Sequence, residues 1–195
     1  MLIRPIVDFD IPAVLEVYRQ SEDFLALGPD PHASLEMVEK DRALSRQQGG
    51  VYCGIFLEDA RKNLIGSVVQ KNLTGLLACP RLRVNLSGLC VGILDYVPNY
   101  HGDPRAAFIE LLMIAGPQRG RGLGKAAVDW LLSTLKVEAA SKRLYAAVQT
   151  NNPGAIRFWL RLGFRITGPA ALQPDGTETY PIEFINPVHS EESET

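Results

Sequence analysis

The segment spanning residues 106–127, AAFIELLMIAGPQRGRGLGKAA, constrains the fold more than any other part of the chain. Its first ten residues form a nearly continuous apolar run, which is typical of a strand covered on both faces. A strand of this kind needs other elements on both sides of its sheet, so the chain is predicted to form helices layered on a sheet. The run leads directly into a loop rich in glycine and basic residues.

The order of the remaining elements agrees with such a layered fold. Strand-like runs lie at residues 2–7, 51–58, 64–70, 89–97, 106–115, 143–150, 164–168 and 179–184. Helical spacing or helix caps mark residues 10–20, 34–50, 125–140 and 153–162, with Asp10 and Asn152 as the expected caps of the first and last. The pattern predicts a mixed α/β protein.

Length and composition limit the classes of protein to consider. With 195 residues the chain is long enough for one domain, predicted over residues 1–188. Residues 71–90 fit neither strand nor helix spacing and are interpreted as an inserted loop or an extra hairpin. The acidic tail, residues 189–195, is predicted to be disordered. A net charge of −2 argues against non-specific binding to nucleic acid.

The cysteines and histidines point to no disulfide framework and no metal site. The three cysteines are odd in number and share no close spacing, which is typical of free thiols in a reducing compartment. The three histidines are far apart and near no cysteine, so no metal is predicted. No apolar run reaches the length of a membrane span, and we therefore expect a cytoplasmic protein without a membrane partner.

The glycine segment has the properties of a phosphate-binding loop. It lies between a strand and the start of a helix, where the first backbone N–H groups have no partner within the helix. These groups and the helix dipole favour an anion, and glycines let several N–H groups turn towards one phosphate. Arg119, Arg121 and Lys125 add positive charge, so a pyrophosphate group is the expected ligand.

Two common nucleotide motifs fit this loop poorly. In a P-loop the Gly-Lys pair is followed by Ser or Thr, but Ala126 follows Lys125 here. A dinucleotide fingerprint matches formally at Gly122, Gly124 and Ala127. However, the next strand ends without the carboxylate that binds the ribose. A dinucleotide-dependent reductase is therefore the least favoured interpretation.

A third motif fits the loop and its surroundings. The sequence RGRGLG, residues 119–124, matches the [QR]-x-x-G-x-[GA] loop that binds acyl-CoA pyrophosphate in the GNAT acetyltransferase superfamily. NNPGAIRFWLRLGF, residues 151–164, resembles the helix that follows in that family. The chain therefore resembles a GNAT enzyme over about residues 105–168. This resemblance implies a mostly antiparallel central sheet with one splayed parallel strand pair, flanked by helices.

The resemblance also implies how acetyl-CoA, the cosubstrate, would be held. Backbone groups of the central strand would bond the pantetheine arm, and one N–H there would stabilise the tetrahedral oxyanion. Loop N–H groups would hold the pyrophosphate, Lys125 or a loop arginine would approach a CoA phosphate, and Asn152 would contact the cofactor besides capping its helix. The implied cofactor-binding residues are Leu112, Met113, Ile114, Arg119, Gly120, Arg121, Gly122, Leu123, Gly124, Lys125, Asn152 and Trp159.

Three further positions bear on the chemistry. Glu110 is the only charge in the apolar strand, where alternation places it on the face of Phe108 and Leu112; buried there, it is a candidate general base or a satisfied ion-pair partner. Asp95 and Tyr96 either line the acceptor pocket or simply end a strand.

Trp159 stands where many GNAT enzymes have a Tyr that protonates the leaving thiolate, and indole cannot take that role. Trp159 then packs on the pantetheine or belongs to the core.

The resulting prediction is an acetyl-CoA-dependent N-acetyltransferase. The expected acceptor is a primary amine of a small molecule, or less readily a protein amine, which attacks the thioester directly. A non-catalytic CoA-binding regulatory module and an acyltransferase with a longer acyl-CoA remain open alternatives. Dimers are common in the family, so a homodimer is one expectation for the oligomeric state.

Overall fold

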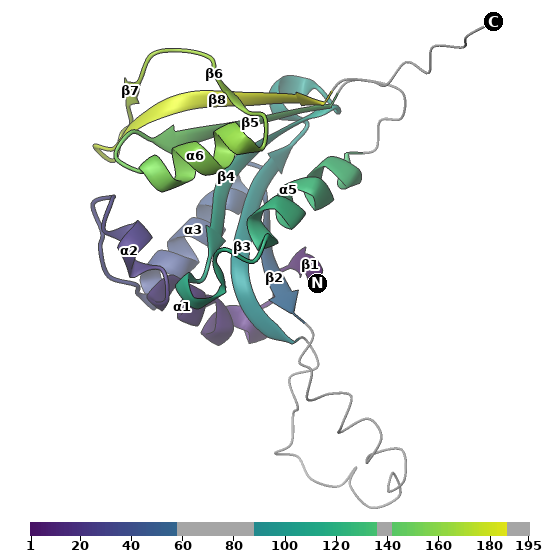
Figure 1. Ribbon diagram of the computed structural model, residues 1–195. Helices are drawn as coiled ribbons and strands as arrows, with labels where there is room; N and C mark the ends of the chain where they lie inside the picture. The colour runs from purple at the N-terminus through teal and green to yellow at the C-terminus, as the bar shows by residue number, and fades with distance from the viewer. Residues whose placement is uncertain (58–87, 136–141, 187–195) are drawn as a thin grey trace, which may run out of the picture.

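A single mixed sheet forms the centre of the molecule. The computed structural model describes residues 1–57, 88–135 and 142–186. The sheet has the strand order β1-β2-β3-β4-β5-β8-β6, with β7 also paired to β8 (Figure 1). The described strands are β1 (Leu2–Pro5), β2 (Val51–Leu57), β3 (Leu89–Pro98), β4 (Ala106–Ile114), β5 (Lys142–Gln149), β6 (Arg165–Ile166), β7 (Ala171–Leu172) and β8 (Glu178–Asn186).

The pairing directions confirm the predicted fold class. β4 and β5 are parallel, whereas every other described pair of strands is antiparallel. The sheet is flanked by helices, as expected. Within the described residues, none of these helices is both long and apolar enough to cross a membrane.

Helices cover both faces of the sheet. The described helices are α1 (Ile11–Arg19), α2 (Glu22–Leu25), α3 (Leu35–Gln47), α5 (Leu123–Thr134) and α6 (Pro153–Arg161). In Figure 1, α5 and α6 lie in front of the sheet and α1 and α3 behind it, while α2 lies at the edge of the opening between β4 and β5. Each face has its own apolar cluster. Leu131 and Phe164 belong to the cluster under α5 and α6, and Val14 and Val38 belong to the one under α1 and α3.

Most predicted helix boundaries are found in the structure. Ser34 Oγ accepts the Met37 N–H at 3.0 Å at the start of α3. Asn152 Oδ1 accepts the Ala155 N–H at 2.9 Å at the start of α6. The predicted helix over 125–140 corresponds to α5, which ends at Thr134. The predicted strand at 64–70, the predicted insertion up to residue 87 and the tail lie outside the described residues, while residues 89–90 belong to β3.

Asp10 stands at the predicted N-cap position of α1, but its side chain does not act as a cap. The helix begins after Asp10, but its carboxylate makes no cap hydrogen bond. Instead it accepts two hydrogen bonds from the Arg4 guanidinium, at 2.7 and 2.8 Å, and one from the Val7 N–H at 3.0 Å. A two-pronged guanidinium is a stronger partner than a helix N–H, so the buried carboxylate joins β1 to α1.

Replacement of Asp10 by Asn should lower the free energy of unfolding by about 2–3 kcal/mol, because it leaves the partly buried Arg4 without its anion. Arg4 holds the pKa of Asp10 below its ordinary value. The stabilisation is therefore complete above that ordinary value, about 3.9, and is lost as the pH falls through the lowered native pKa. Urea unfolding of both proteins at neutral and acidic pH measures the difference.

Asp8→Asn provides the matched control for this prediction. Asp8 also pairs with an arginine, Arg42, but its side chain is 93% exposed. Exposed pairs contribute about 0–1 kcal/mol, so this change should barely move the urea midpoint. Equal effects of the two substitutions would contradict the assignment of Asp10.

Candidate active site

The strands β4 and β5 part half way along their length. Their parallel pairing covers only Ala106–Ile109 and Arg143–Ala146, although both strands continue beyond it. Figure 1 shows the resulting opening between the two ribbons, with α5 and α6 starting beside it. The predicted splayed strand pair is therefore present.

A β-bulge on β4 marks the point where the strands part. In the register with β3, Tyr96 lies opposite Ile109 and Asp95 lies opposite Leu111. Glu110 is the extra residue between them, directly after the last residue of β4 that pairs with β5. An added residue bends its strand and increases its twist, which accounts for the divergence at this position.

The bulge also changes which side chains share a face. Ile109 and Leu112 both pack in the cluster under α5 and α6, although they are three residues apart. Leu111 and Met113 pack on the opposite face, under α1 and α3. The alternation predicted from the sequence put the side chains of Phe108, Glu110 and Leu112 on one face of the strand. The prediction is right for Phe108 and Glu110, but Leu112 lies on the opposite face.

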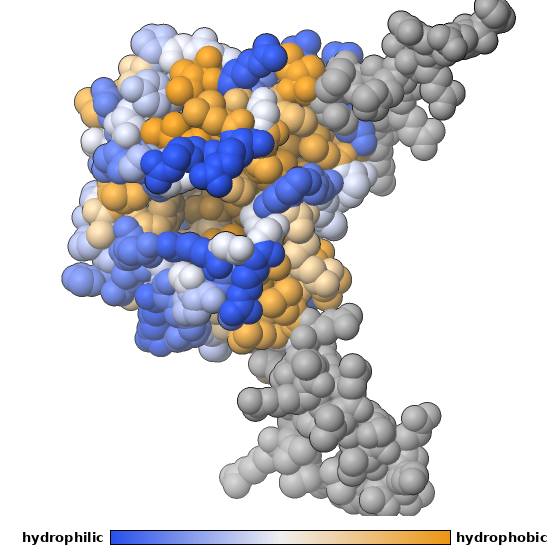
Figure 2. All heavy atoms as spheres, in the orientation of Figure 1, coloured by the Kyte–Doolittle hydropathy of each residue, from blue (hydrophilic) through white to orange (hydrophobic). Residues whose placement is uncertain are grey.

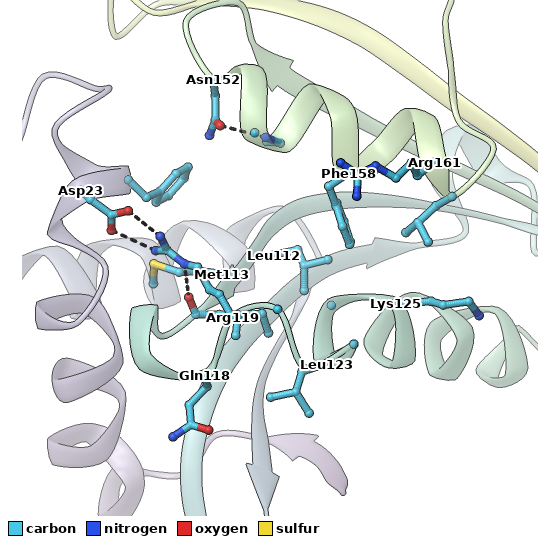
Figure 3. Close-up of a pocket in the computed structure, with 18 of the residues that line it drawn as sticks. Asp23, Leu112, Met113, Gln118, Arg119, Leu123, Lys125, Asn152, Phe158 and Arg161 are labelled. Atoms are coloured by element: carbon cyan, nitrogen blue, oxygen red, sulfur yellow. Dashed lines mark hydrogen bonds and ion pairs between the residues drawn. The ribbon is translucent and has the colours of Figure 1, made fainter.

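A cavity of about 620 Å³ lies at the opening, between the end of β4, the glycine loop, α2 and α6, and we call it the splay cavity. Figure 3 shows side chains from β4, the glycine loop, α2 and α6 converging on it. Figure 2 shows the hollow on the surface, with an apolar floor between hydrophilic rims. Its lining comprises Asp23, Phe24, Leu27, Leu112, Met113, Ile114, Gln118, Arg119, Gly120, Gly122, Leu123, Gly124, Lys125, Asn152, Gly154, Ala155, Phe158, Arg161 and Leu162.

Backbone groups of β4 face this cavity because β5 no longer covers them. The Ala115 N–H donates to Val91 O on β3 at 2.9 Å. Backbone direction alternates along a strand, so the polar groups of Leu112 and Ile114 point away from β3 and into the opening. Met113, which was predicted with them, lines the cavity with its side chain while its backbone faces β3.

The glycine loop presents its N–H groups to the same cavity. Gly120 and Gly122 have φ angles of +75° and +77°, the left-handed region that side chains disfavour. Among the described residues, the N–H groups of residues 120–125 have no hydrogen-bond partner, and pairing resumes with Ala126, which donates to Gly122 O at 3.0 Å. The Arg119 N–H donates to Gly116 O at 3.2 Å, so the loop's available N–H groups begin one residue later than predicted.

The Arg119 side chain is committed to the protein rather than free for a ligand. Its Nε donates to Ile114 O at 2.9 Å, and its guanidinium forms a two-pronged ion pair with Asp23 on α2 (Figure 3). This pairing lowers the pKa of Asp23. Sequence reasoning missed Asp23, because nothing local marks a partner 96 positions away.

The cavity suits a ligand with an anionic head and a long, partly apolar arm. The free N–H groups at the start of α5 suit phosphate oxygens. Gln118 belongs to the lining, but its side chain points away from the centre of the cavity (Figure 3), and its buried Oε1 atom has no partner among the described residues. Coenzyme A offers these features, with a pyrophosphate, two amides and a thiol arm. Within the described residues, no cluster of three or more His, Cys, Asp or Glu side chains could hold a metal ion.

The remaining predicted cofactor residues fall into two groups. Asn152 and Lys125 line the splay cavity; Asn152 also caps α6, and Lys125 pairs with Asp129 at 2.6 Å. Arg121 is exposed and lies outside the lining. Trp159 also lies outside it, buried against Phe164 with ring centroids 4.7 Å apart.

On α6 it is Phe158, and not the predicted Trp159, that lines the splay cavity. Its ring lines the cavity near Gly124, where a Cβ atom would lie 3.0 Å from Phe158 Cζ. Arg161 follows one helical turn later and adds a cation to the rim. Ala155 and Leu162 also line the cavity, and the i, i+3, i+7 spacing of Ala155, Phe158 and Leu162 was a signal in the sequence for this face of the helix.

The carboxylates beside the bulge form an electrostatically coupled group. Glu110 is solvent-exposed, not buried as predicted, but partial desolvation and the nearby Asp95 carboxylate raise its pKa. Asp95 is buried and accepts a hydrogen bond from Ser45 Oγ at 2.6 Å, and burial raises its pKa as well. Tyr96 points to the opposite face, where its ring packs against Trp130. Asp95 and Tyr96 therefore do not line one pocket.

Fold and site together define an acyl-CoA-dependent class of transferase. The chain matches the Acetyltransferase (GNAT) family over residues 19–164, and it belongs to that family of acetyltransferases, whose members use acetyl-CoA. A search of curated proteins finds no significant match.

Several solved structures share this fold. Spermidine N-acetyltransferase from Vibrio cholerae, in complex with CoA and spermine, is 15% identical with a TM-score of 0.57, covering 94% of each chain. Ribosomal-protein-alanine N-acetyltransferase from Brucella melitensis is 18% identical with a TM-score of 0.58, covering 95% of this chain and all of the other. Ard1 from Thermoplasma volcanium is 19% identical with a TM-score of 0.56, covering 94% and 96%.

Substitution of Gly122 by Ala should weaken CoA binding. A Cβ at this left-handed φ is strained by about 1–2 kcal/mol, so residue 122 will leave that conformation and turn its neighbouring N–H groups away from the cavity. Loss of one or two hydrogen bonds predicts a five- to tenfold higher Kd, roughly, in isothermal titration with CoA.

Gly49→Ala is the matched control, since Gly49 has a φ of +74° at the end of α3 and, like Gly122, open space around it. Both variants should lose similar stability, but only Gly122→Ala should lose affinity for CoA. Wild-type affinity in Gly122→Ala would show that the loop does not hold the ligand.

Proposed function

We propose that this protein transfers the acetyl group of acetyl-CoA to a primary amine of a small cationic molecule. The observation that carries the proposal is the splay cavity, which joins the unpaired backbone of β4 to the unpaired N–H groups at the start of α5. Its shape and donors suit the arm and the pyrophosphate of one CoA molecule. Acetyl-CoA supplies an activated acetyl group when it is bound there.

The chain's own residues have distinct roles in this proposal. The N–H groups of residues 120–125 bind the pyrophosphate, and Leu112 and Ile114 offer backbone groups to the pantetheine arm. An N–H of β4 that faces the opening also stabilises the negative charge that develops on the carbonyl oxygen during attack. Fixed donors of this kind need no reorganisation as the charge forms.

Glu110 is the proposed general base. An alkylamine has a pKa of about 10, so it is mostly protonated at neutral pH and has to lose a proton before it attacks. The Glu110 carboxylate lies at the point where the sheet opens, is reached by solvent, and has a raised pKa. These properties suit a base that accepts the proton through water.

Negative charge beside the opening supports a cationic acceptor. Asp95 and Glu110 are coupled carboxylates on the face of the sheet under α3. Among the structural neighbours, the Vibrio cholerae enzyme is described in complex with spermine, a small amine, and the Brucella melitensis enzyme is named for a protein substrate. We favour the small amine because of these carboxylates.

The proposal is tested by incubating the protein with acetyl-CoA and a panel of amines while free thiol is measured. Transfer to at least one small amine is expected, and acetyl-CoA at 100 times its Kd should stabilise the fold by about 2.7 kcal/mol. Propionyl-CoA and succinyl-CoA in the same assay identify a longer-chain donor. Absence of both thermal stabilisation and thiol release would refute the proposal.

Replacement of Glu110 by Gln should lower kcat/KM for the amine by about 10²–10⁴, the usual contribution of a general base. Because the native pKa is raised, the acidic limb of the wild-type pH profile should lie above the ordinary glutamate value of about 4.3. Activity falls as the pH drops through that limb, since protonated Glu110 cannot accept a proton. The limb should be absent in the variant.

Glu183→Gln is the control for Glu110→Gln. Glu183 lies in β8 opposite Tyr145, which pairs with Phe108, so it shares the face of Glu110 two strands away. The kcat/KM and the pH profile of the Glu183→Gln variant should match those of the wild type. An unchanged acidic limb in Glu110→Gln would exclude Glu110 as the base.

A further inference from the structure

A second cavity lies beside the splay cavity and shares a wall with it. It has a volume of about 440 Å³ and lies between the segment that joins α2 to α3, the first turns of α3 and the end of β5. Phe24 on α2 lines both cavities. A molecule in this second space is therefore next to the opening in which the acetyl group would lie.

Acidic side chains outnumber basic ones in the lining of this second cavity, and we call it the acidic cavity. Four carboxylates line it, those of Asp30, Glu36, Asp41 and Asp175. The only lysine or arginine in its described lining is Lys40. Apolar side chains, Phe24 and Met37 among them, form part of the wall and could cover a short run of methylene groups. The lining thus suits a cation on an aliphatic chain.

Asp41 is held in place by hydroxyl groups behind it. Tyr18 donates to Asp41 Oδ2 at 2.7 Å, and the Tyr18 and Tyr52 hydroxyls are themselves 2.7 Å apart. Asp41 Oδ1 has no hydrogen-bond partner among the described residues. Burial raises the pKa of Asp41, a cost that a bound cation would offset.

Gln149 supplies an independent indication of a ligand. Its side chain lines the acidic cavity from the end of β5, and its Oε1 atom is buried without a partner among the described residues. A carbonyl oxygen only accepts hydrogen bonds, and a buried acceptor without a donor is costly. An ammonium group carries donors only, so it matches both this oxygen and the neighbouring carboxylates.

We infer that the acidic cavity binds the second ammonium group of the acceptor, and that the acceptor class is therefore the aliphatic diamines and polyamines. One amine enters the opening beside Glu110, while the other is held by Asp41 and Gln149. The inference rests on the proposed function and adds the substrate class to it. A monoamine of the same length fills the apolar part of the path and leaves both polar groups unsatisfied.

The first test compares 1,4-diaminobutane with butylamine, which has the same chain and lacks the second cation. The kcat/KM for the diamine should be at least about tenfold higher, the effect of a hydrogen bond between charged groups. The part of the advantage that comes from the exposed carboxylates, Asp30, Glu36 and Asp175, should shrink as salt is added, because screening weakens attraction between exposed charges. Equal kcat/KM values for the two amines would overturn the inference.

The second test uses two variants that act on different groups. Asp41→Asn keeps the shape of the side chain and can still accept from Tyr18; it should reduce the diamine-to-monoamine ratio of kcat/KM about tenfold or more. Gln149→Met removes a carbonyl that has no internal partner and should reduce the ratio about threefold or more. The control is Glu39→Gln, on α3 outside the lining, which should keep the wild-type ratio. A wild-type ratio in both Asp41→Asn and Gln149→Met would overturn the inference.

Binding without turnover separates this inference from the proposed function. In the presence of CoA, 1,4-diaminobutane should raise the Tm of the wild type and raise it less in Asp41→Asn. If this shift in Tm is seen but no amine is acetylated, the acidic cavity is supported as a diamine-binding site and the proposed function is refuted. If monoamines are acetylated and the diamine has no Asp41-dependent effect, the function stands and the assignment of the acidic cavity fails.

Discussion

The parting of β4 and β5 is the constraint on which the rest of the site depends. Two parallel strands that stay paired satisfy each other's backbone groups and leave no room between them. Arg119 Nε satisfies the carbonyl of Ile114, but once pairing stops after Ile109, the backbone groups of Leu112 and the N–H of Ile114 need other partners, because an unpaired polar group is costly. The opening therefore has to hold either water or a ligand that resembles a strand, and an amide-bearing arm is such a ligand.

The bulge at Glu110 links this opening to the proposed acid–base chemistry. The same extra residue ends the pairing with β5 and carries the carboxylate, so the proposed base is fixed at the level where the two strands separate. The bulge also turns Leu112 to the face under α5 and α6 while Glu110 stays with the face under α3. An acetyl donor that approaches from one face of the sheet and an amine that approaches from the other would meet through the opening.

Sequence reasoning succeeded where the signal was local. The apolar run, the glycine loop and the capped helix with Asn152 are each encoded within a few consecutive residues, and the fold class and family followed from their order. The bulge was not visible, because a single added residue is defined only by the register against β3. For the same reason Glu110 and Leu112 were placed on one face. Phe158 and Trp159 differ by one position on a helix, so choosing between wall and core needed the orientation of α6.

The Arg119–Asp23 pair shows that a basic residue in a glycine-rich loop can have a structural partner instead of a ligand. A loop with glycines at 120, 122 and 124 has high conformational entropy, which binding would have to offset. Arg119 fixes one end of this loop to Ile114 O and to α2, and the close approach of Gly124 to Phe158 fixes the other. These two contacts restrict the conformations of the loop between them, which lowers the entropy that binding has to offset. Phe24 follows Asp23 on α2, so the same ion pair also ties the glycine loop to the helix that forms the wall shared by the two cavities.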